Sequence, residues 1–424
     1  MKSIIKSNHK GVPQKLQINK HNKSVLVKKL ILICLLISVF VGEAQNFSGW
    51  NRKQAITIDQ NQVPGTSDLI DFPFLVTLDY LDSEIVDGGA NSALNGGGDI
   101  RFSSDAAGNN RLAVEIVEFI TDASLANRKC QIWVKIPNLS ATSNTTIYVW
   151  YNKAGEAQPA ATDVYGSQNV WINNNYVSIW HLDENATSGI LQIKDSGENS
   201  NDGVSKEIMD SSNSVISKVG GGINLKGTNF FNVGNNTSLN LTANLTISGW
   251  FKPNKLHDFY VMAKRSETVV NGYNILPQLQ GFVSYYDGSS IPDSGLNYNI
   301  NEWNYIVVKL NSSGTGVTIF LNGNFSSEMT VIAPSDGLAQ NLYLGSRSNG
   351  AFGKLDGAID ELRVSNTFRS DEWISTEYNN MSNPSAFAVA GTPESAIIDT
   401  QAPTAPTLSS AVQTDTTVDL SWTA

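Results

Sequence analysis

The chain has 424 residues, a formal net charge of −10, 16% charged residues and 41% apolar residues. The length suggests two or three domains of about 150 residues each, and the apolar fraction is high enough to build their cores. The acidic balance argues against a nucleic-acid partner, which requires clustered Lys and Arg. Two cysteines are too few for a disulfide-rich or zinc-ribbon protein.

The first 44 residues have the order of a secretory signal peptide. They contain eight Lys and a single acid, Glu43, and the apolar run Leu30–Val41 is followed by the small residues Gly42 and Ala44. This order of basic, apolar and small residues predicts cleavage after Ala44. The apolar run has 12 residues, short of the ~20 that span a bilayer as a helix. We therefore expect a secreted or cell-surface protein with no transmembrane segment in the mature chain; the alternative is an uncleaved N-terminal anchor.

Removal of this leader makes the mature chain more acidic. Lys plus Arg falls from 29 to 21 and Asp plus Glu from 39 to 38, which gives a net charge of about −17. One cysteine remains, Cys130, in the same strand phase as Ile132 and Val134. We expect a buried, inert thiol there.

The mature chain is predicted to be almost entirely β. Short alternating or apolar runs rich in Val, Ile, Thr and aromatic residues recur between Gly, Asn, Asp and Ser clusters. In a first domain, residues 45–168, six strands are expected, and this number fits a β-sandwich. Their predicted ranges are 54–58, 73–78, 99–103, 112–120, 130–136 and 145–151.

A second domain is expected over residues 169–390, with many strands in two sheets as in a jelly roll. One short helix is predicted near its end, with Ser370 as N-cap and with Asp371 and Glu372 in the first turn. The clearest strand candidates are 177–182, 222–225, 245–251, 260–263, 305–310, 317–321, 342–344 and 359–364.

The end of the chain is predicted to hold a linker and an incomplete third domain. Residues 391–402 have the composition of a linker. Residues 403–424 resemble the first two strands of a fibronectin type III domain, with Trp422 as the core residue of the second strand. Only 22 residues are present, against ~100 for an Ig-like sandwich of this kind, so we expect a fragment of a longer gene product.

The second domain resembles the laminin-G-like, concanavalin A-like jelly-roll family. The segments that carry the resemblance are Trp180-His-Leu-Asp-Glu184, Leu245-Thr-Ile-Ser-Gly-Trp-Phe-Lys-Pro253, Glu302-Trp-Asn-Tyr-Ile-Val308, Ile319-Phe-Leu-Asn-Gly323 and Gly357-Ala-Ile-Asp-Glu-Leu-Arg-Val364. The first domain, through Gly49-Trp-Asn-Arg-Lys53 and Ile147-Tyr-Val-Trp-Tyr-Asn152, resembles a bacterial secreted domain of unknown function. The whole arrangement looks like large envelope or secreted proteins of Bacteroidetes-type bacteria.

Glycoside hydrolysis is the activity that the resemblance raises first, since some concanavalin A-like jelly rolls are glucanases. Such enzymes need two carboxylates on one face, about 5 Å apart in retaining enzymes. No Glu in the chain is followed two residues later by Asp, and the acidic strand 356–361 lacks the middle carboxylate of a Glu-x-Asp-x-x-Glu pattern. His-Glu-x-x-His and Gly-x-Ser-x-Gly motifs are also absent. We assign no catalytic residue, and we expect His181 to be a hydrogen-bonded structural histidine.

Calcium is the expected metal. Asp195, Asn199, Asn201 and Asp202 crowd into one Gly-containing loop, and calcium prefers carboxylate, amide and carbonyl oxygens. The resemblance implies that this loop and the Asp360 strand bear such sites in some members of the family. The alternative is a solvated turn, because Asp, Asn and Gly are common turn residues.

A sugar-binding surface is predicted at Tyr285 and Tyr286. Adjacent residues of a strand point to opposite faces, so one ring can be exposed and stack on a sugar. The alternative is that both rings pack inside the sandwich.

These observations predict an all-β, non-catalytic, secreted or cell-surface protein that binds a polysaccharide or surface glycan or mediates adhesion. One alternative is an accessory region of a polysaccharide-degrading enzyme whose catalytic domain lies beyond residue 424. A second alternative is a structural spacer in a surface stalk.

Overall fold

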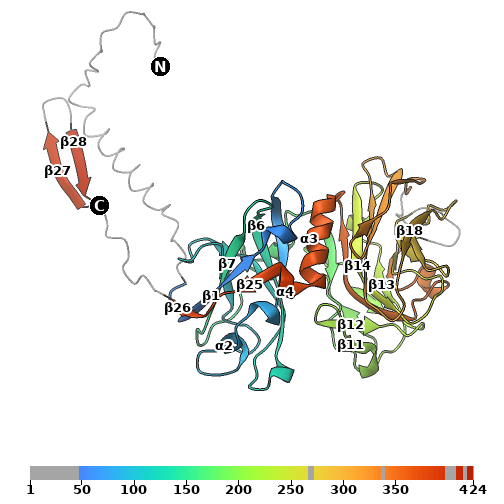
Figure 1. The fold of residues 1–424 in the computed structure, drawn as a ribbon, viewed down its shortest axis with the longest axis horizontal. Coiled ribbons are helices and arrows are strands. Elements are labelled where there is room, and N and C mark those ends of the chain that lie inside the picture. Colours follow the sequence, from blue (N-terminus) through green and yellow to red (C-terminus); the bar gives the residue numbers. More distant parts are fainter. Residues whose placement is uncertain (1–46, 266–271, 336–339, 397–406, 414–417, 424) are drawn as a thin grey trace, which may run out of the picture. The chain divides into compact units, whose positions relative to one another are not determined.

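The computed structural model describes residues 47–265, 272–335, 340–396, 407–413 and 418–423. Its described part consists mostly of antiparallel strands with few helices, which confirms the all-β prediction (Figure 1). The predicted signal peptide and residues 397–402 of the predicted linker lie outside the described residues. Two antiparallel strands, β27 (Thr407–Gln413) and β28 (Val418–Thr423), form in the region predicted to begin a third domain.

The first domain is a sandwich of two antiparallel sheets, and all six predicted strand regions form strands. The smaller sheet has the order β2–β6–β5, and the larger has the order β25–β1–β7–β3–β4, with β26 also paired to β1. The strands are β1 (Arg52–Ile58), β2 (Leu69–Thr77), β3 (Arg101–Ser103), β4 (Arg111–Leu112), β5 (Val114–Ile120), β6 (Lys129–Leu139), β7 (Thr145–Tyr151), β25 (Ala388–Ala390) and β26 (Glu394–Ser395).

Strand β6 is covered on both faces. Ile132 and Val134 are fully buried in the core of the first sandwich, as their alternation predicts. Trp133, which points to the opposite face, is also buried, and its ring lies 5.5 Å from the ring of Trp171 in the segment that leads into the second domain. Cys130 is half-buried, with Sγ 3.5 Å from the carbonyl oxygen of Val76, and burial raises the pKa of its thiol. This protonated, shielded thiol agrees with the predicted inert role.

The second domain has the two sheets expected of a jelly roll. One sheet has the order β18–β17–β16–β15–β23–β13–β10–β9. Its strands are β9 (Gln192–Ile193), β10 (Gly203–Ser205), β13 (Phe231–Gly234), β15 (Met262–Ala263), β16 (Asn274–Pro277), β17 (Phe282–Ser284), β18 (Asp293–Asn297) and β23 (Leu342–Leu344).

The other sheet has the order β11–β12–β24–β14–β19–β20–β21, with β8 paired to β24 and β22 to β20. Its strands are β8 (Tyr176–Trp180), β11 (Ser214–Ile216), β12 (Gly221–Asn224), β14 (Leu245–Pro253), β19 (Asn304–Leu310), β20 (Gly316–Leu321), β21 (Asn324–Phe325), β22 (Met329–Thr330) and β24 (Gly357–Ser365). Every residue of β19 and β24 is buried. Their inner faces pack in the jelly-roll core. On the outer face, Tyr305 and Val307 of β19 join the core of the first sandwich, whereas β24 presents the buried charged residues Glu361 and Arg363.

Helix α3 (Asp371–Ser382) begins where the sequence predicts and connects the two sandwiches. The Ser370 hydroxyl accepts the N–H of Trp373, as an N-cap should. The Trp373 ring packs on Phe72 of the first sandwich at 5.1 Å, and the Tyr378 ring lies 6.0 Å from Trp250 of the jelly roll.

After α3 the chain returns to the first sandwich. The short helix α4 (Pro384–Phe387) leads into β25, which pairs with β1, and β26 pairs with the beginning of the same strand. On sequence grounds residues 388–390 belong to the second domain and 394–395 to a linker. Both segments in fact extend the sheet of the first sandwich.

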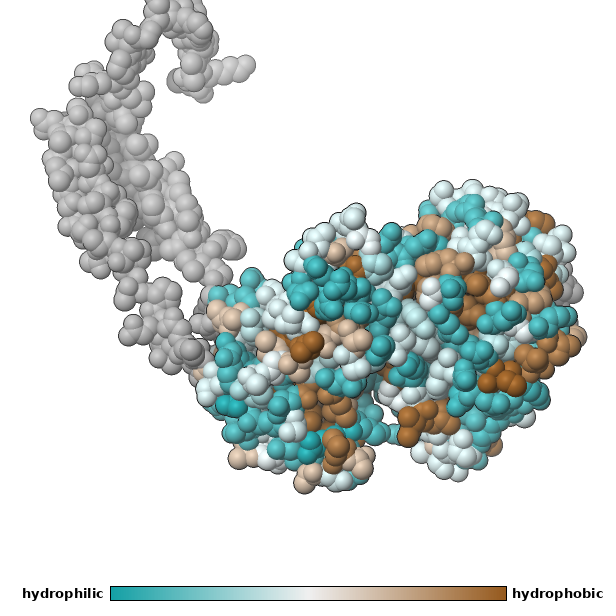
Figure 2. Space-filling model, in the orientation of Figure 1, coloured by the Kyte–Doolittle hydropathy of each residue, from teal (hydrophilic) through white to brown (hydrophobic). Residues whose placement is uncertain are grey.

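Polar residues cover most of the molecular face in Figure 2, and apolar residues gather there in small separate patches. A surface of this kind is typical of a folded β-protein in water. Functional groups are therefore expected in pockets and polar clusters.

Candidate functional site

A cluster of buried charges joins the two sandwiches. His181 follows β8, and its Nδ1 lies 2.7 Å from Oε1 of Glu361 in β24, while its Nε2 lies 3.2 Å from Oε2 of Glu115 in β5. Arg363 donates to Glu361 at 2.8 Å and to Glu377 of α3 at 2.9 Å. The structure thus confirms that His181 is a hydrogen-bonded histidine inside the fold.

The electrostatics of the cluster follow from pairing under strong burial. Burial disfavours the charged imidazole, but Glu361 and Glu115 outweigh this effect, so the pKa of His181 lies well above its usual range. Burial also opposes ionisation of Glu361, yet His181 and Arg363 lower its pKa below the ordinary value. Pairing therefore keeps His181, Glu361 and Arg363 in their charged forms although all three are buried.

A β-bulge in β24 sets up this contact. The pairing of β14 with β24 shifts between Ser248 and Trp250, and Glu361 takes a left-handed backbone conformation with φ of 49°. Such bulges redirect a side chain at the cost of local pairing. Here the redirected carboxylate reaches the first sandwich, where it also accepts a hydrogen bond from Gln131 at 2.8 Å.

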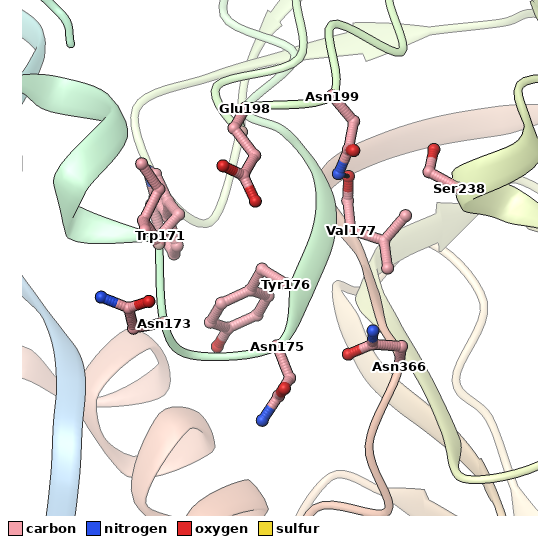
Figure 3. Close-up of a pocket in the computed structure, with 11 residues that line it drawn as sticks. Trp171, Asn173, Asn175, Tyr176, Val177, Glu198, Asn199, Ser238 and Asn366 are labelled. Carbon is pink, nitrogen blue, oxygen red and sulfur yellow. Dashed lines mark hydrogen bonds between the residues drawn. The ribbon is translucent and has the colours of Figure 1, made fainter.

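An open pocket of about 300 Å³ lies where the chain enters the jelly roll (Figure 3). Residues 171–177, which lead into and begin β8, form one side, and the turn 197–199 forms another. Ser238 and Asn366 complete the lining. The turn belongs to the loop predicted to bind calcium.

Two aromatic side chains line this pocket, and hydrogen bonds hold both in place. The Trp171 indole N–H donates to Glu115, and the Tyr176 hydroxyl donates to Glu377 at 2.6 Å. The two rings meet edge to face, with centroids 5.3 Å apart. Because both rings are anchored in the buried charge cluster, no ordering of their side chains is needed when a ligand binds.

Four polar side chains of the lining have no hydrogen-bond or ion-pair partner in the described part of the chain: Asn173, Asn175, Glu198 and Asn366. All four are exposed. In Figure 3 the Glu198 carboxylate extends from its loop toward the space beside Tyr176. Amides both donate and accept hydrogen bonds, and a carboxylate accepts them, so this set can grip several hydroxyl groups at once.

The loop predicted to bind calcium is held together by its own hydrogen bonds. Asp195 accepts the backbone N–H groups of Ile179, Gly197 and Asn201 at 2.9 Å each. Asp202 accepts the Asp195 N–H at 3.0 Å and pairs with a lysine ammonium. N–H groups that already point at the carboxylates do not fit a cation in the same place.

The remaining predicted ligands also have internal roles. The Asn199 amide donates to the Val177 carbonyl, and the Asn201 amide donates to the hydroxyls of Ser178 and Ser238. Asp360 is fully buried and accepts the Val219 N–H, and burial, with the nearby Glu361, raises its pKa well above the ordinary value.

Within the described residues no group of three or more His, Cys, Asp or Glu side chains is arranged to hold a metal ion. Calcium binding stays a prediction.

The two tyrosines predicted to bind sugar point in different directions. Tyr285 is 1% exposed, lies in the jelly-roll core, and donates its hydroxyl to the Gly272 carbonyl. Tyr286 is half-buried, and the guanidinium of Arg265 lies over its ring, 4.0 Å from the centroid. A ligand can reach only Tyr286 of this pair, and one face of that ring is already covered.

A second pocket, of about 510 Å³, is lined by residues of both sandwiches, among them Lys129, Gln131, Glu184 and Ile216. Glu184 accepts the Lys194 N–H through Oε1, while its Oε2 is buried without a hydrogen-bond partner. Burial raises the pKa of Glu184 to about 7. This pocket carries one carboxyl group that changes charge near neutral pH.

Of the residues that line the 300 Å³ pocket, only Asn199 was predicted from the sequence as a site residue, and then as a calcium ligand. Asn173, Asn175 and Asn366 read as ordinary turn residues, and Glu198 as a solvated acid of a loop. The signal in the sequence was the run Asn173-Asn-Asn175, which lies after Trp171-Ile172 and before a buried strand. Three consecutive amides are more than a tight turn needs.

Comparisons with known proteins concern mainly the jelly roll. The family model described as the concanavalin A-like lectin/glucanases superfamily matches residues 225–375. No curated protein matches the chain.

Several solved structures resemble part of the chain. Domain 4 of AbnA, a GH43 extracellular arabinanase from Geobacillus stearothermophilus in complex with arabinotriose, is 17% identical with a TM-score of 0.39, over 49% of this chain and 98% of that one. The binding domain of Paraclostridial Mosquitocidal Protein 1 is 16% identical with a TM-score of 0.36, over 50% and 52%. The Trypanosoma rangeli sialidase in complex with 2,3-difluorosialic acid is 12% identical with a TM-score of 0.37, over 54% and 34%. The chain thus spans about half of the second structure and a third of the last.

The resemblances of the first domain and of residues 403–424 to known families stay predictions. Of the helices in the described ranges, none has the length and apolar character needed to cross a bilayer. The two sheets of the second domain, together with the family match at residues 225–375, give this part of the chain a concanavalin A-like jelly-roll fold.

Proposed function

We propose that this protein binds glycans without hydrolysing them, and that the pocket in Figure 3 holds the sugar. The observation that carries the proposal is the set of four unpartnered polar side chains beside the Tyr176 ring, which is held in place by Glu377 and by the ring of the buried Trp171. A sugar presents alternating hydroxyl groups and apolar C–H faces. Amides and a carboxylate suit the hydroxyls, and aromatic surface suits the C–H faces.

Binding is proposed instead of hydrolysis because the pocket offers too few carboxylates for hydrolysis. Among the described residues that line it, Glu198 is the only acid. Hydrolysis of a glycosidic bond uses two carboxyl groups that flank the bond. A single exposed carboxylate serves as a hydrogen-bond acceptor for a sugar hydroxyl.

A glycan array with the full chain, followed by calorimetric titration of the strongest ligand, tests the proposal. Glu198→Gln and Asn366→Ala should each weaken binding about tenfold, because each removes one hydrogen-bonding group from the sugar. Glu207→Gln and Asn109→Ala are matched controls, since both residues are exposed and lie outside the pocket. Equal affinity of all four variants, or no bound glycan, would contradict the proposal.

The same titration can also test calcium binding. Repeating it with calcium and with a chelator, together with a melting curve for each, tests the prediction at Asp195, Asn199, Asn201, Asp202 and Asp360. A higher melting temperature with calcium supports a site there. An unchanged temperature favours the alternative of a turn held by its own hydrogen bonds.

Secretion or surface display completes the proposal. Expression in a bacterial host should yield an exported product whose first residue is Gln45, as found by N-terminal sequencing. An accessory role in polysaccharide degradation requires glycan binding, whereas a structural spacer does not. The array therefore separates these two alternatives.

A further inference from the structure

Two arginines share one tyrosine ring on the jelly roll, away from the residues that line either pocket. Arg265 follows β15 and Arg347 follows β23, and their guanidinium carbons lie 5.9 and 5.7 Å from the Tyr260 ring centroid. Arg265 also lies over the Tyr286 ring, and Arg347 lies 4.8 Å from the Phe352 ring centroid. Aromatic faces attract guanidinium groups and hold them in a fixed plane.

Both guanidinium groups have buried N–H donors without an acceptor. Arg265 is 4% exposed; its Nη1 donates to the Tyr260 hydroxyl at 3.0 Å, but its Nε has no hydrogen-bond partner. Nη1 of Arg347 is likewise buried and unpartnered. Nη2 of Arg265 and both Nε and Nη2 of Arg347 also lack a hydrogen-bond partner in the described residues but are not enclosed, so an incoming acceptor can reach these donors.

No carboxylate neutralises these two arginines among the described residues. The buried Arg363, by contrast, is paired with both Glu361 and Glu377. Asp287 is the acid that directly follows Tyr286 in the chain, and its carboxylate accepts the backbone N–H groups of Ser289, Ser290 and Ile332.

The backbone beside Arg347 is also unusual. Ser348, Asn349 and Gly350 are three consecutive residues with left-handed φ, at 50°, 55° and 81°. Ser is disfavoured in that region, and such strain persists where the surrounding structure requires it. The turn brings the backbone of Arg347 back to Phe352, with which it forms an isolated β-bridge.

We propose that Arg265 and Arg347 form a second binding site, for an oxyanion such as a carboxylate or a sulfate group. The planar fork of a guanidinium matches the two oxygens of such a group. The rings of Tyr260 and Tyr286 hold the fork before the ligand arrives. Tyr286 thus supports an arginine, where the sequence had suggested direct stacking on a sugar.

The site is independent of the pocket proposed for neutral sugar hydroxyls, because the two share no lining residue. Arg347 is the more exposed of the two arginines, so it presents the positive charge toward solvent. The ligand chemistry is that of the oxyanion, carried either by a free ion or by an acidic saccharide.

Calorimetric titration of the full chain at low ionic strength tests the site. The probes are an oligogalacturonate, sodium sulfate and a neutral maltooligosaccharide. The wild type should bind the oligogalacturonate, and Arg347→Gln should weaken this binding about tenfold or more, because it removes a charge-assisted hydrogen bond. If sulfate also binds, the site recognises the oxyanion itself. If the oligogalacturonate binds and sulfate does not, the site recognises an oxyanion carried by a saccharide. Both outcomes support the proposal.

Three variants serve as controls. Lys252→Gln removes another half-buried cation without an ion pair in the described residues, and it should leave the affinity unchanged. Glu198→Gln should also bind the anion as the wild type does, which separates this site from the proposed glycan pocket. Arg347→Lys keeps the charge but loses the fork, so its affinity should be intermediate. Wild-type affinity in a folded Arg347→Gln variant, or no anion binding by the wild type, would overturn the proposal.

Discussion

His181 shows how one residue can couple the two sandwiches to pH. Its pKa in the folded protein is raised well above 6.5, because Glu361 and Glu115 outweigh the effect of burial. The stability that this imidazolium contributes is therefore fully present below pH ~6.5 and is lost as the pH rises through the folded-state pKa.

We predict that His181→Gln lowers the free energy of unfolding by about 3 kcal/mol at pH 6, since it leaves two buried carboxylates without their shared cation. The difference between variant and wild type should shrink toward alkaline pH. Urea unfolding curves at several pH values between 6 and 10 measure it. A difference that does not change with pH would contradict the charged state of His181.

Glu184 also makes the folded protein less stable as the pH rises, over a lower pH range. Burial raises its folded-state pKa to about 7 from the ordinary value of 4.5, so the folded protein binds this proton more tightly than the unfolded chain does. Stability should therefore fall as the pH rises from about 4.5 to about 7. Glu184→Gln removes this dependence and should be more stable than the wild type by about 1 kcal/mol or more at pH 8, yet equal to it at pH 4. Urea unfolding curves of both proteins at these two pH values measure the difference. An equal difference in stability at pH 4 and pH 8 would contradict the raised pKa.

At the residue scale, the sequence predicted the role of a single residue better than it predicted which residues contact each other. A hydrogen-bonded His181 was predictable from its place beside Trp180 in an apolar segment. Its partners were not, because Glu115 and Glu361 lie 66 and 180 residues away in the chain. The bulge that redirects Glu361 has no local sequence signature.

Helix α3 is the element whose position decides how the sandwiches contact each other. Asn380 accepts the Leu75 N–H at 2.7 Å and donates to the Leu75 carbonyl at 3.2 Å, so it extends the hydrogen bonding of β2 beyond the sheet. We predict that Asn380→Ala lowers the free energy of unfolding by about 2 kcal/mol, because both backbone groups of Leu75 are left buried without a partner.

Ser375→Ala is the control for this helix, since no hydrogen bond of the Ser375 side chain is present in the described structure. It should change stability by less than about 0.5 kcal/mol. Chemical denaturation of both variants compares them. Equal effects would show that Asn380 does not bind β2 in solution.

Element prediction succeeded where the signal was local. The N-cap at Ser370 and the acidic first turn predicted the start of α3, and period-2 alternation predicted the strands of the first sandwich. Strands β25 and β26 were missed because they are short and pair with β1 across more than three hundred residues. No periodicity within three residues can indicate such a partner.

The whole molecule is predicted to unfold as one unit over the two sandwiches. One apolar core cluster contains residues of both, including Trp133 and Tyr305, and the His181 charge cluster and α3 cross the same boundary. Differential scanning calorimetry at neutral pH should show a single transition for this region. Two transitions would contradict a shared core if their midpoint temperatures shifted independently when the pH is changed or when His181→Gln is introduced.

The central claim is that the pocket beside Trp171 and Tyr176 binds a sugar. A crystal structure of the full chain with the strongest glycan from the array is its most direct test. We predict electron density for a sugar ring within hydrogen-bond distance of Glu198, Asn175 or Asn366. Density at another surface, with this pocket holding only water, would contradict the claim.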